Sequence, residues 1–321
     1  MNDIAYYQEI FLKHLEANKI EGKPSTLYEP ANYILQLGGK RMRPVLLLLA
    51  YHAFDEELNN ALDAAMAIEV FHNFTLAHDD IMDAAPLRRG KATLHEKYNL
   101  PVAILAGDVL LIKSYQLLLK NPGKADPLQL LSIFNKAAIE ICEGQQMDMD
   151  FETSDEVSEE AYLKMIAYKT AVLLGAAMEI GALMGGASAH DAALMYQFAL
   201  NVGLAFQVRD DFLDTFGDPE KVGKKPGGDI IQNKKTLLMI RCLAKANEEE
   251  KAEIFSNEGS PSEKIERVIR LYLKYEVDSG AQQVQEFYYN QAMHSLDQAD
   301  MAESRKDVLK QFARWLLERT H

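Results

Sequence analysis

The same five-residue pattern, D-D-x-x-D, occurs twice in this sequence, as Asp79-Asp80-Ile81-Met82-Asp83 and as Asp210-Asp211-Phe212-Leu213-Asp214. Each run lies in a long helical pattern, which extends from Ala61 to Ala85 for the first run and from Ala192 to Phe216 for the second. Residues four apart share one face of a helix, so the first and last aspartates of each run are neighbours. Like charges on one face repel each other unless a cation lies between them. The two runs therefore predict two cation-binding faces.

The ligand chemistry of the two runs favours magnesium. Carboxylates without accompanying His or Cys suit a hard cation, and Mg²⁺ takes part of its shell from water and substrate phosphate. Two such faces aimed at each other would clamp a diphosphate. A single acidic run is usually a solvated helix face, but apolar and aromatic residues such as Phe74 and Phe206 precede these runs. The candidate metal ligands are Asp79, Asp80, Asp83, Asp210, Asp211 and Asp214.

The periodicity of the apolar residues predicts an all-α fold. Apolar residues make up 48% of the 321-residue chain, and helical periodicity dominates while alternating β patterns are scarce. A chain of this length forms one or two domains. Because the two acidic runs are expected to act together, we predict a single domain over residues 1–321.

Charge and cysteine content restrict the partners and the compartment. The net charge of −14 disfavours nucleic acid and anionic membranes as partners. The two cysteines, Cys142 and Cys242, form no disulfide framework, so a cytoplasmic location is expected. Residues 1–11 lack the charge and apolar pattern of a signal peptide. The apolar stretch Thr170 to Ala189 contains Glu179 and several glycines, and is interpreted as a central bundle helix with no transmembrane role.

Two basic segments are candidates for anion binding. The first, Gly38-Gly39-Lys40-Arg41-Met42-Arg43-Pro44, has three cations within four residues, which repel one another unless an anion is bound. A basic turn of this kind is more often plain surface. The second, Leu87-Arg88-Arg89-Gly90, follows the helix stop Pro86. Its adjacent arginine side chains leave the backbone in different directions, so each can serve a different anion.

In these motifs the chain resembles the trans-isoprenyl diphosphate synthases, or polyprenyl synthetases. The resemblance extends in motifs from Gly38 to about Thr236 and includes the pairs Lys169-Thr170 and Phe206-Gln207. One departure is Ala92, where the family usually has proline after the arginine pair. The resemblance implies a helical bundle of the isoprenoid synthase type around a central cavity. It also implies an all-trans prenyltransferase that condenses isopentenyl diphosphate with dimethylallyl, geranyl or farnesyl diphosphate by ionisation, condensation and elimination.

The resemblance also implies the roles of single residues. The residues matched to isopentenyl diphosphate are Lys40, Arg43, His72 and Arg89. The residues matched to the allylic diphosphate are Arg88, Lys169, Lys224 and Lys234, with Lys235 left open as the alternative to Lys234. Lys169, Thr170 and Gln207 are placed at the reacting centre. Magnesium is the implied cofactor, with three ions once substrate is bound, and the implied assembly is a homodimer.

Product length is predicted from the residues upstream of the first acidic run. In the family, bulky side chains at these positions form the floor of the cavity. Phe74 and Phe71 precede Asp79 by about 7 and 12 Å along the helix axis. An aromatic residue at the fifth position with Thr75 at the fourth resembles synthases of the twenty-carbon geranylgeranyl diphosphate. Phe71 leaves fifteen-carbon farnesyl diphosphate as the alternative.

Three other functions fit the sequence less well. A terpene cyclase of the same fold would alter the second acidic run, and a regulatory subunit would lose one of the runs, but both runs are intact. A metal-dependent phosphohydrolase built on His72, His78 and Asp79 lacks further suitably spaced histidines. Near the end of the chain, Glu248 to Ser262 is predicted to be a polar linker, with Ser262 capping the helix that follows.

Overall fold

The computed structural model describes residues 4–154, 156–218, 226–256 and 258–318, and these are predominantly helical. The first elements are α1 (Ile4–Ala17), α2 (Ser25–Leu35), α3 (Met42–His52), η1 (Leu58–Ala61), α4 (Leu62–Met82), β1 (Leu87–Arg88), β2 (Lys91–Ala92), α5 (Leu94–Lys97), α6 (Leu100–Leu118) and α7 (Pro127–Thr153). The others are α8 (Glu159–Ile166), the π-helix η2 (Ala167–Ala171), α9 (Val172–Gly185), α10 (Ala189–Phe216), α12 (Gly228–Ile231), α13 (Leu237–Lys245), α14 (Glu248–Phe255), α15 (Pro261–Lys274), α16 (Val277–Gln298) and α17 (Glu303–Glu318). In the described ranges the hairpin of β1 and β2 is the only sheet. The predicted all-α class is confirmed.

The chain forms two compact units whose boundaries fall inside α7, α9, α10 and α17 and between α16 and α17. Unit 1 comprises Met1–Asn135, Ala176–Tyr196 and Asp300–Arg305, and unit 2 comprises Lys136–Gly175, Gln197–Ala299 and Lys306–His321. The first acidic run belongs to unit 1 and the second to unit 2. The single domain over residues 1–321 stays a prediction.

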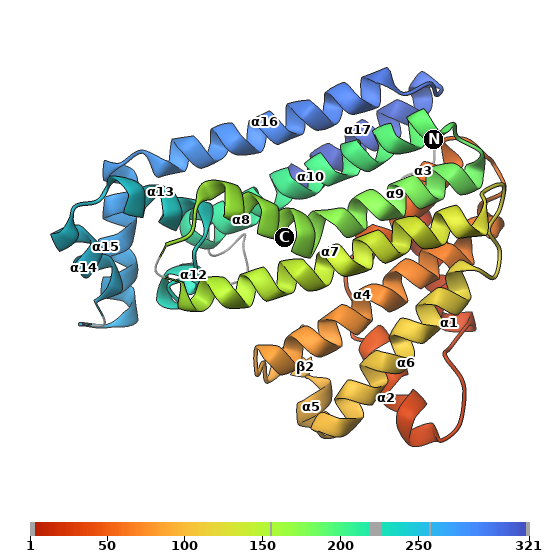
Figure 1. Cartoon of the computed structure of the whole chain (residues 1–321), viewed down its shortest axis with the longest axis horizontal. Helices are drawn as coiled ribbons and strands as arrows, with labels where there is room; N and C mark the ends of the chain where they lie inside the picture. Colours follow the sequence, from red (N-terminus) through yellow and green to blue (C-terminus); the bar gives the residue numbers. More distant parts are fainter. Residues whose placement is uncertain (1–3, 155, 219–225, 257, 319–321) are drawn as a thin grey trace. The chain divides into compact units, whose positions relative to one another are not determined.

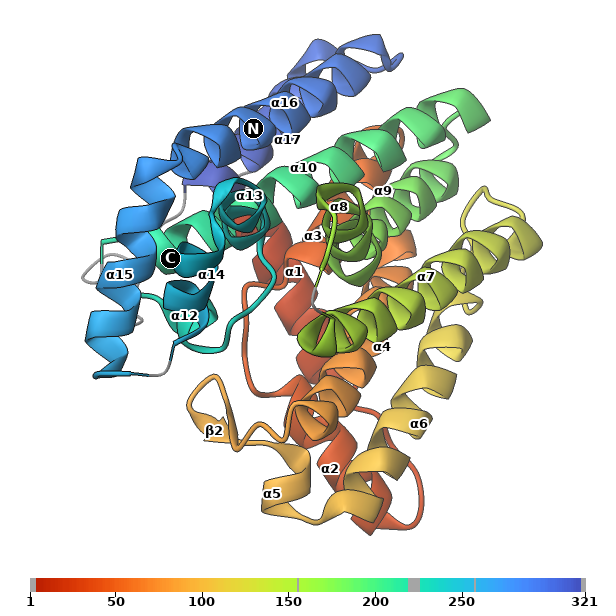
Figure 2. The ribbon, with the colours of Figure 1, turned by 60° about the vertical axis from the view of Figure 1, so that its left-hand side comes forward.

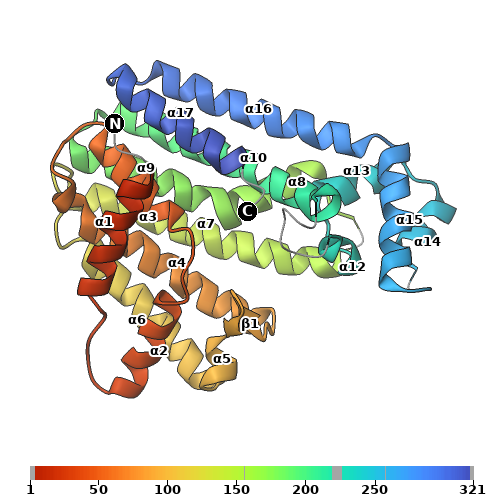
Figure 3. The ribbon, with the colours of Figure 1, turned by 180° about the vertical axis from the view of Figure 1, so that it is seen from behind.

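Unit 1 is built around α3 and α4. Figures 1 and 2 both show α6 running alongside α4, and Figure 3 shows α1 beside α3. Every residue of α3 from Pro44 to His52 is buried, as are most residues of α4. The end of α9 packs against the backbone of α3 so closely that a Cβ atom at Gly181 would lie 2.3 Å from the carbonyl oxygen of Leu47. The small residues of the apolar stretch are therefore required for close helix packing.

Two helical stretches, Leu100–Leu118 and Glu159–Gly185, are long and apolar enough to cross a membrane by length and composition alone. The second has 72% of its apolar window buried inside the protein, which is the behaviour of a core helix. The first has only 28% of its window buried and leaves apolar side chains exposed. This exposed face of α6 therefore needs a separate explanation.

Unit 2 has its own core, formed by α8, α13, α15 and α16 and including Tyr162, Met239, Val268 and Tyr272. The predicted linker is partly wrong, because Glu248–Phe255 forms α14. Asn247 and Glu250 satisfy its first amides through a capping box.

The predicted cap at Ser262 is also wrong. Ser260 caps α15 through a capping box with Glu263, and Pro261 occupies the first turn. A serine three residues before a glutamate, with proline at the first helical position, is the stronger start signal because it satisfies two amides and removes a third.

Candidate active site

Both acidic runs lie at the carboxyl ends of their helices. α4 ends at Met82, three residues before the predicted end, because Asp83 is its C-cap and Ala84 adopts a left-handed conformation with φ of 48°. The Asp83 amide still donates to the Asp79 carbonyl at 2.8 Å, so the last turn continues through the run. The second run lies within the last turns of α10. Because a helix carboxyl end carries partial negative charge, carboxylates here are unfavourable unless a cation compensates them.

Asp80 is the buried member of the first run. The residue is 1% exposed, and its Oδ1 accepts hydrogen bonds from Arg88 Nη2 at 2.6 Å and Nε at 2.8 Å. Its Oδ2 is buried and has no hydrogen-bond partner. A buried carboxylate oxygen without a partner is costly, so this atom has the chemistry of a metal ligand.

The arginine pair lies in the hairpin β1–β2, in which Arg88 pairs with Lys91. Its two turn residues, Arg89 and Gly90, have φ of 53° and 74°, the positive values of a type I′ turn. Arg89 Nη1 donates to the carbonyl oxygen of Gly38, and a Cβ atom at Gly39 would lie 2.6 Å from the guanidinium. The two glycines of the basic loop therefore make room for the second arginine of the hairpin, a link that the sequence did not reveal.

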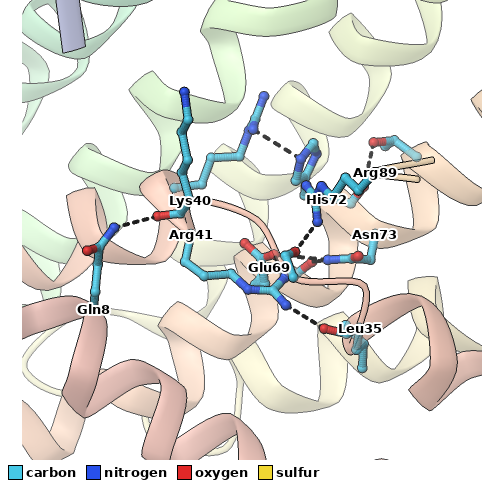
Figure 4. Close-up of polar contacts among 11 residues, drawn as sticks. Gln8, Leu35, Lys40, Arg41, Glu69, His72, Asn73 and Arg89 are labelled. Atoms are coloured by element: carbon cyan, nitrogen blue, oxygen red, sulfur yellow. Dashed lines mark hydrogen bonds and ion pairs between the residues drawn. The ribbon is translucent and has the colours of Figure 1, made fainter. Parts of the chain in front are cut away.

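Arg41 is separated from the other cations of the basic loop. It is 5% exposed, forms an ion pair with Glu69 and donates to the Leu35 carbonyl, while Glu69 also accepts from Asn73 at 3.0 Å (Figure 4). The Lys40 side chain extends away from Arg41 in the same view. Because Arg41 is already paired with Glu69, it is unsuited to binding an external anion. The resemblance likewise matched only Lys40 and Arg43 to the diphosphate.

Arg43 and His72 form a half-buried polar pair. Arg43 Nη1 lies 3.1 Å from His72 Nε2, and since a guanidinium can only donate, Nε2 is the acceptor. Burial, together with the nearby Arg89, lowers the pKa of Arg43 to about 10, although Glu69 opposes this shift. Burial and the surrounding arginines, Arg43 first, also hold the pKa of His72 well below 6.5. The imidazole is therefore neutral, and the excess positive charge of this region is available to an anion.

The predicted floor residues form part of a series of aromatic contacts. The ring of Phe74 lies 4.9 Å from His78 and 5.5 Å from Phe71. Phe71 is 1% exposed and contacts Phe134 of α7 at 5.0 Å, which in turn contacts Tyr115. Phe71 is therefore enclosed behind Phe74 by a second helix. Thr75 donates to the carbonyl of His72 at 2.8 Å.

Asp211 is the buried member of the second run, at 6% exposure. Tyr162 donates its hydroxyl to Oδ2, and Gln207 Nε2 donates to Oδ1 at 3.1 Å. Burial raises the pKa of Asp211 to about 7 against the lowering effect of Tyr162. The Gln207 amide oxygen faces the hydroxyl of Thr170 at 3.4 Å, so three of the residues predicted from sequence are joined in one network.

Lys169 lies in the π-helix η2, where the helix widens by one residue. Its Nζ donates to Asp148 Oδ2 at 2.6 Å. A Cβ atom at Gly144 would lie 2.4 Å from the Lys169 amide nitrogen, so only glycine lets α7 approach this segment. The Lys169 side chain is 26% exposed and is paired with Asp148, which offsets the cost of placing a lysine in an apolar helix.

Lys234 and Lys235, the two candidate lysines after the second run, have side chains in different surroundings. Burial disfavours the charged form of Lys234, but the nearby carboxylates together have a larger effect and raise its pKa. These carboxylates, in order of decreasing effect, are Asp229, Asp148, Asp211 and Asp210. Lys235 instead lies over the ring of Phe255 at 4.8 Å. The other predicted lysine, Lys224, lies outside the described residues.

Sequence reasoning missed two contributors to this region. Tyr162 precedes Lys169 by seven residues and carries no motif, so only packing reveals its bond to Asp211. The amide of Asp229 donates to Asp214 Oδ2 at 2.9 Å, and its carboxylate lies 3.9 Å from Lys234. The glycine-aspartate pair 228–229 was a visible signal for the second contributor.

Comparison with known proteins decides the family. The family model for polyprenyl synthetase matches residues 24–274. The chain belongs to the polyprenyl synthetase family. Like other polyprenyl synthetases, it is a prenyltransferase. It is 39% identical to a geranylgeranyl diphosphate synthase of Sulfolobus acidocaldarius, over 98% of this chain and 97% of that protein.

Further similar polyprenyl synthetases bear different product names. A geranylfarnesyl diphosphate synthase of Natronomonas pharaonis is 39% identical over 68% of this chain and 70% of that protein. A crystal structure of a geranylgeranyl pyrophosphate synthase superimposes with a TM-score of 0.92 at 40% identity, covering 99% of each chain. These similarities show the helical prenyltransferase fold and leave product length to be argued from the chain itself.

The side chains of this polyprenyl synthetase fit magnesium that is shared with substrate. In the described ranges, no three His, Cys, Asp or Glu side chains are grouped so that they could hold a metal alone. Mg²⁺ commonly uses one or two carboxylates and completes its shell with water and phosphate oxygens. The partnerless Oδ2 of Asp80 and the all-carboxylate donor set agree with such a shared ion.

Proposed function

We propose that this polyprenyl synthetase condenses isopentenyl diphosphate with allylic diphosphates and stops at geranylgeranyl diphosphate. The observation that carries the twenty-carbon assignment is the half-buried Phe74, which is backed by the fully buried Phe71 and, through it, by Phe134. A phenylalanine supported in this way cannot turn aside for a longer chain without displacing a second helix. The fifteen-carbon alternative would require Phe71 itself to reach the product, but its ring is enclosed.

Isopentenyl diphosphate is bound, in this proposal, by Lys40, Arg43, His72 and Arg89. The support is the excess positive charge around Arg43, where burial and repulsion from Arg89 both lower the pKa. A diphosphate relieves that repulsion, and arginine presents paired donors to its oxygens. His72 stays neutral, accepts from Arg43 and so orients the guanidinium.

The allylic diphosphate is bound by Arg88, Lys169, Lys224 and Lys234, and its ions are held by Asp79, Asp80, Asp83, Asp210, Asp211 and Asp214. Magnesium bound by these aspartates supplies charge stabilisation for the departing diphosphate, and three ions are expected with substrate present. Of the two lysines left open by the sequence, Lys234 is proposed because Asp229 and the second acidic run surround it. Lys235 is occupied by its contact with Phe255.

The reaction begins when the carbon–oxygen bond of the allylic diphosphate breaks and leaves an allylic cation. Lys169, held by Asp148, places a positive charge where the leaving oxygen gains negative charge. Thr170 and Gln207 present a hydroxyl and an amide beside it. The isopentenyl double bond then attacks the cation to form a carbon–carbon bond. Loss of a proton, which the released diphosphate accepts in this proposal, completes a new allylic diphosphate.

A product assay tests the proposal. The protein is incubated with Mg²⁺, isopentenyl diphosphate and, separately, dimethylallyl, geranyl or farnesyl diphosphate, and product length is read by mass spectrometry. A twenty-carbon product from all three primers is expected. A fifteen-carbon product would indicate that Phe71, and not Phe74, forms the floor of the cavity. A twenty-five-carbon product would contradict the floor assignment of both residues. No elongation from any primer would sink the catalytic proposal and favour a partner subunit or a hydrolase.

Phe74→Ala provides the first mutational test. Removing the ring opens the volume in front of Phe71, so products longer than twenty carbons should form from farnesyl diphosphate. Phe287→Ala is the matched control, because this ring is 55% exposed on α16 and takes no part in the floor. An unchanged product from Phe74→Ala would refute the floor assignment.

We also infer that the protein is a cytoplasmic homodimer that pairs through α6. Leu105, Ile112 and Leu119 recur every seven residues and are 56%, 58% and 39% exposed, and Leu128 nearby in sequence is 73% exposed. An apolar stripe of this kind is costly in water and is typical of an interface. Cys242 is a buried free thiol, in keeping with a reducing compartment.

Light scattering after size-exclusion chromatography tests the dimer. The wild-type chain should have twice the chain mass of 36.1 kDa, and the double variant Leu105→Glu, Ile112→Glu should run as a monomer. Leu273→Glu, at an exposed apolar site on α15, is the control and should remain a dimer. A monomeric wild-type chain, or one that instead binds lipid vesicles through α6, would contradict this assignment.

A further inference from the structure

The hairpin that carries Arg88 and Arg89 is a weak element by local criteria. Each strand has two residues, and an isolated two-stranded hairpin is at best marginally stable in water. Its type I′ turn prefers Asn, Asp or Gly at the first central position, whereas this chain has Arg89 with φ of 53°. Ala92 also leaves the second strand without the backbone restraint of the proline that the family usually has there. The position of the two guanidinium groups must therefore be set by contacts from outside the hairpin.

Two side-chain hydrogen bonds restrain the hairpin at its second strand. Thr93, which is fully buried, donates its hydroxyl to the Ala85 carbonyl at 2.8 Å and ties the end of the hairpin to the chain just after α4. Tyr33, on α2, donates its hydroxyl to the carbonyl of Ala92 at 2.8 Å. Of these two side chains, only Tyr33 comes from an element distant in sequence, 59 residues away.

The ring of Tyr33 is itself held in place. The ammonium of Lys97, at the end of α5, lies 3.5 Å from its centroid, and the ring of Tyr98 meets it edge-on at 6.0 Å. A cation over an aromatic face and an edge-to-face ring are both attractive. The phenol is therefore fixed by two neighbours, and its hydroxyl can restrain the hairpin.

We infer that Tyr33 is a positioning residue for the two arginines of the hairpin, acting through the Ala92 carbonyl. This inference rests on the proposed roles of Arg88 and Arg89 as diphosphate ligands. Tyr33 bonds to the Ala92 carbonyl, whereas Arg88 contacts Asp80 and Arg89 contacts Gly38. Losing its hydroxyl frees the second strand, so that each guanidinium samples more positions. We expect the loss to appear as weaker diphosphate binding. The rate of the chemical step should change little, because the same arginines take part in it once the diphosphates are bound.

Tyr33→Phe tests the inference because it removes one oxygen atom and keeps the ring under Lys97. The KM values for isopentenyl and allylic diphosphate should both rise about threefold to tenfold, the range expected for one neutral hydrogen bond, while kcat changes less than about twofold. Calorimetry with a thio analogue of the allylic diphosphate, whose carbon–sulfur bond resists ionisation, should show the same loss of affinity. Tyr98→Phe is the matched control and should leave both KM values unchanged.

A double-mutant comparison separates positioning from a general structural effect. In an Arg88→Gln, Arg89→Gln background, Tyr33→Phe should cost less than about twofold, because the groups through which it acts are gone. Lys97→Gln, which leaves the hydroxyl in place, should give a smaller effect than Tyr33→Phe in the same direction.

The outcomes against the inference are distinct from those against the proposed function. Unchanged KM and analogue affinity in Tyr33→Phe would overturn the inference alone, as would a full effect that persists without the two arginines. If the arginine variants themselves bind both diphosphates normally, the proposed ligand roles fall and the inference falls with them. Should Tyr33→Phe lose its thermal transition, the graded effect of Lys97→Gln on KM decides the question in its place.

Discussion

The two acidic runs have the same local sequence and the same place at a helix end, but their buried aspartates have different neighbours. Asp80, in unit 1, is paired with the guanidinium of Arg88. Asp211, in unit 2, accepts from the neutral groups of Tyr162 and Gln207. The first run therefore has a compensating cation within the chain. The second has only dipoles for direct partners, and its pKa of about 7 shows the cost of burial without one.

This difference teaches that a repeated ligand motif need not provide two equivalent sites. An arginine neutralises a carboxylate permanently, whereas hydroxyl and amide donors orient it and leave its charge to an arriving cation. In the proposed role of the two runs as magnesium sites, the first run is organised before the ion binds, and the second gains more from the ion. Four predictions test this contrast, in order of decreasing effect.

Removing the first aspartate of either run should be the most damaging change. Asp79→Ala and Asp210→Ala should each reduce kcat by about three or more powers of ten, because both runs are proposed to hold the ions that stabilise the leaving diphosphate. Steady-state kinetics at saturating Mg²⁺ measures this, with circular dichroism as the check on folding. If one folded variant kept near-normal turnover, the two runs would be unequal in function as well as in environment.

The neighbouring lysines after the second run offer a matched pair. Lys234→Ala should raise the KM for the allylic diphosphate roughly tenfold to a hundredfold, as expected for a charge-assisted hydrogen bond. Lys235→Ala should change it less than about twofold, since it loses only a contact with Phe255. Equal effects, or the reverse order, would show that Lys235 reaches the diphosphate.

Neutralising the buried aspartates should affect stability in different ways. Asp80→Asn breaks an ion pair whose arginine is 25% exposed, so the free energy of unfolding should fall by about 1–3 kcal/mol after discounting for solvent. Asp211→Asn removes a desolvated charge that lacks a direct cationic partner, so it should be neutral or stabilising in the presence of a chelator. Urea unfolding of both variants measures the difference. Equal destabilisation would erase the proposed contrast.

The smallest expected effect is the pH dependence of stability that comes from His72, which lies among the arginines of unit 1. The folded pKa of His72 lies below its ordinary value of 6.5, so below this pH the unfolded chain binds a proton that the folded chain refuses. Stability is therefore lost as pH falls through 6.5, by up to about 1.4 kcal/mol per pH unit for this one group. His72→Gln should flatten the curve between pH 7 and pH 5 in a chelator. A curve that keeps its slope in the variant would assign the pH dependence to other groups.

Much of the fold and site could be predicted because the responsible signals are local. The all-α class follows from helical periodicity, and the resemblance that named the candidate residues follows from short motifs such as Gly38 to Pro44. The capping box at Ser260 is also a local signal, because Pro261 and Glu263 follow it at the spacing of a helix start. The early end of α4 was missed because Asp83 and Ala84 carry no local stop signal before Pro86.

The sequence by itself determined which side chains are available: six aspartates in two helical repeats, two basic segments, and an aromatic residue upstream of the first run. These depend on spacing along a helix, which is a property of the local chain. Only the tertiary structure decided their partners, since contacts such as Arg88 with Asp80, Tyr162 with Asp211 and Tyr33 with Ala92 join different elements. Burial and a neighbour's charge set the state of each group, and both arise when separate elements pack together.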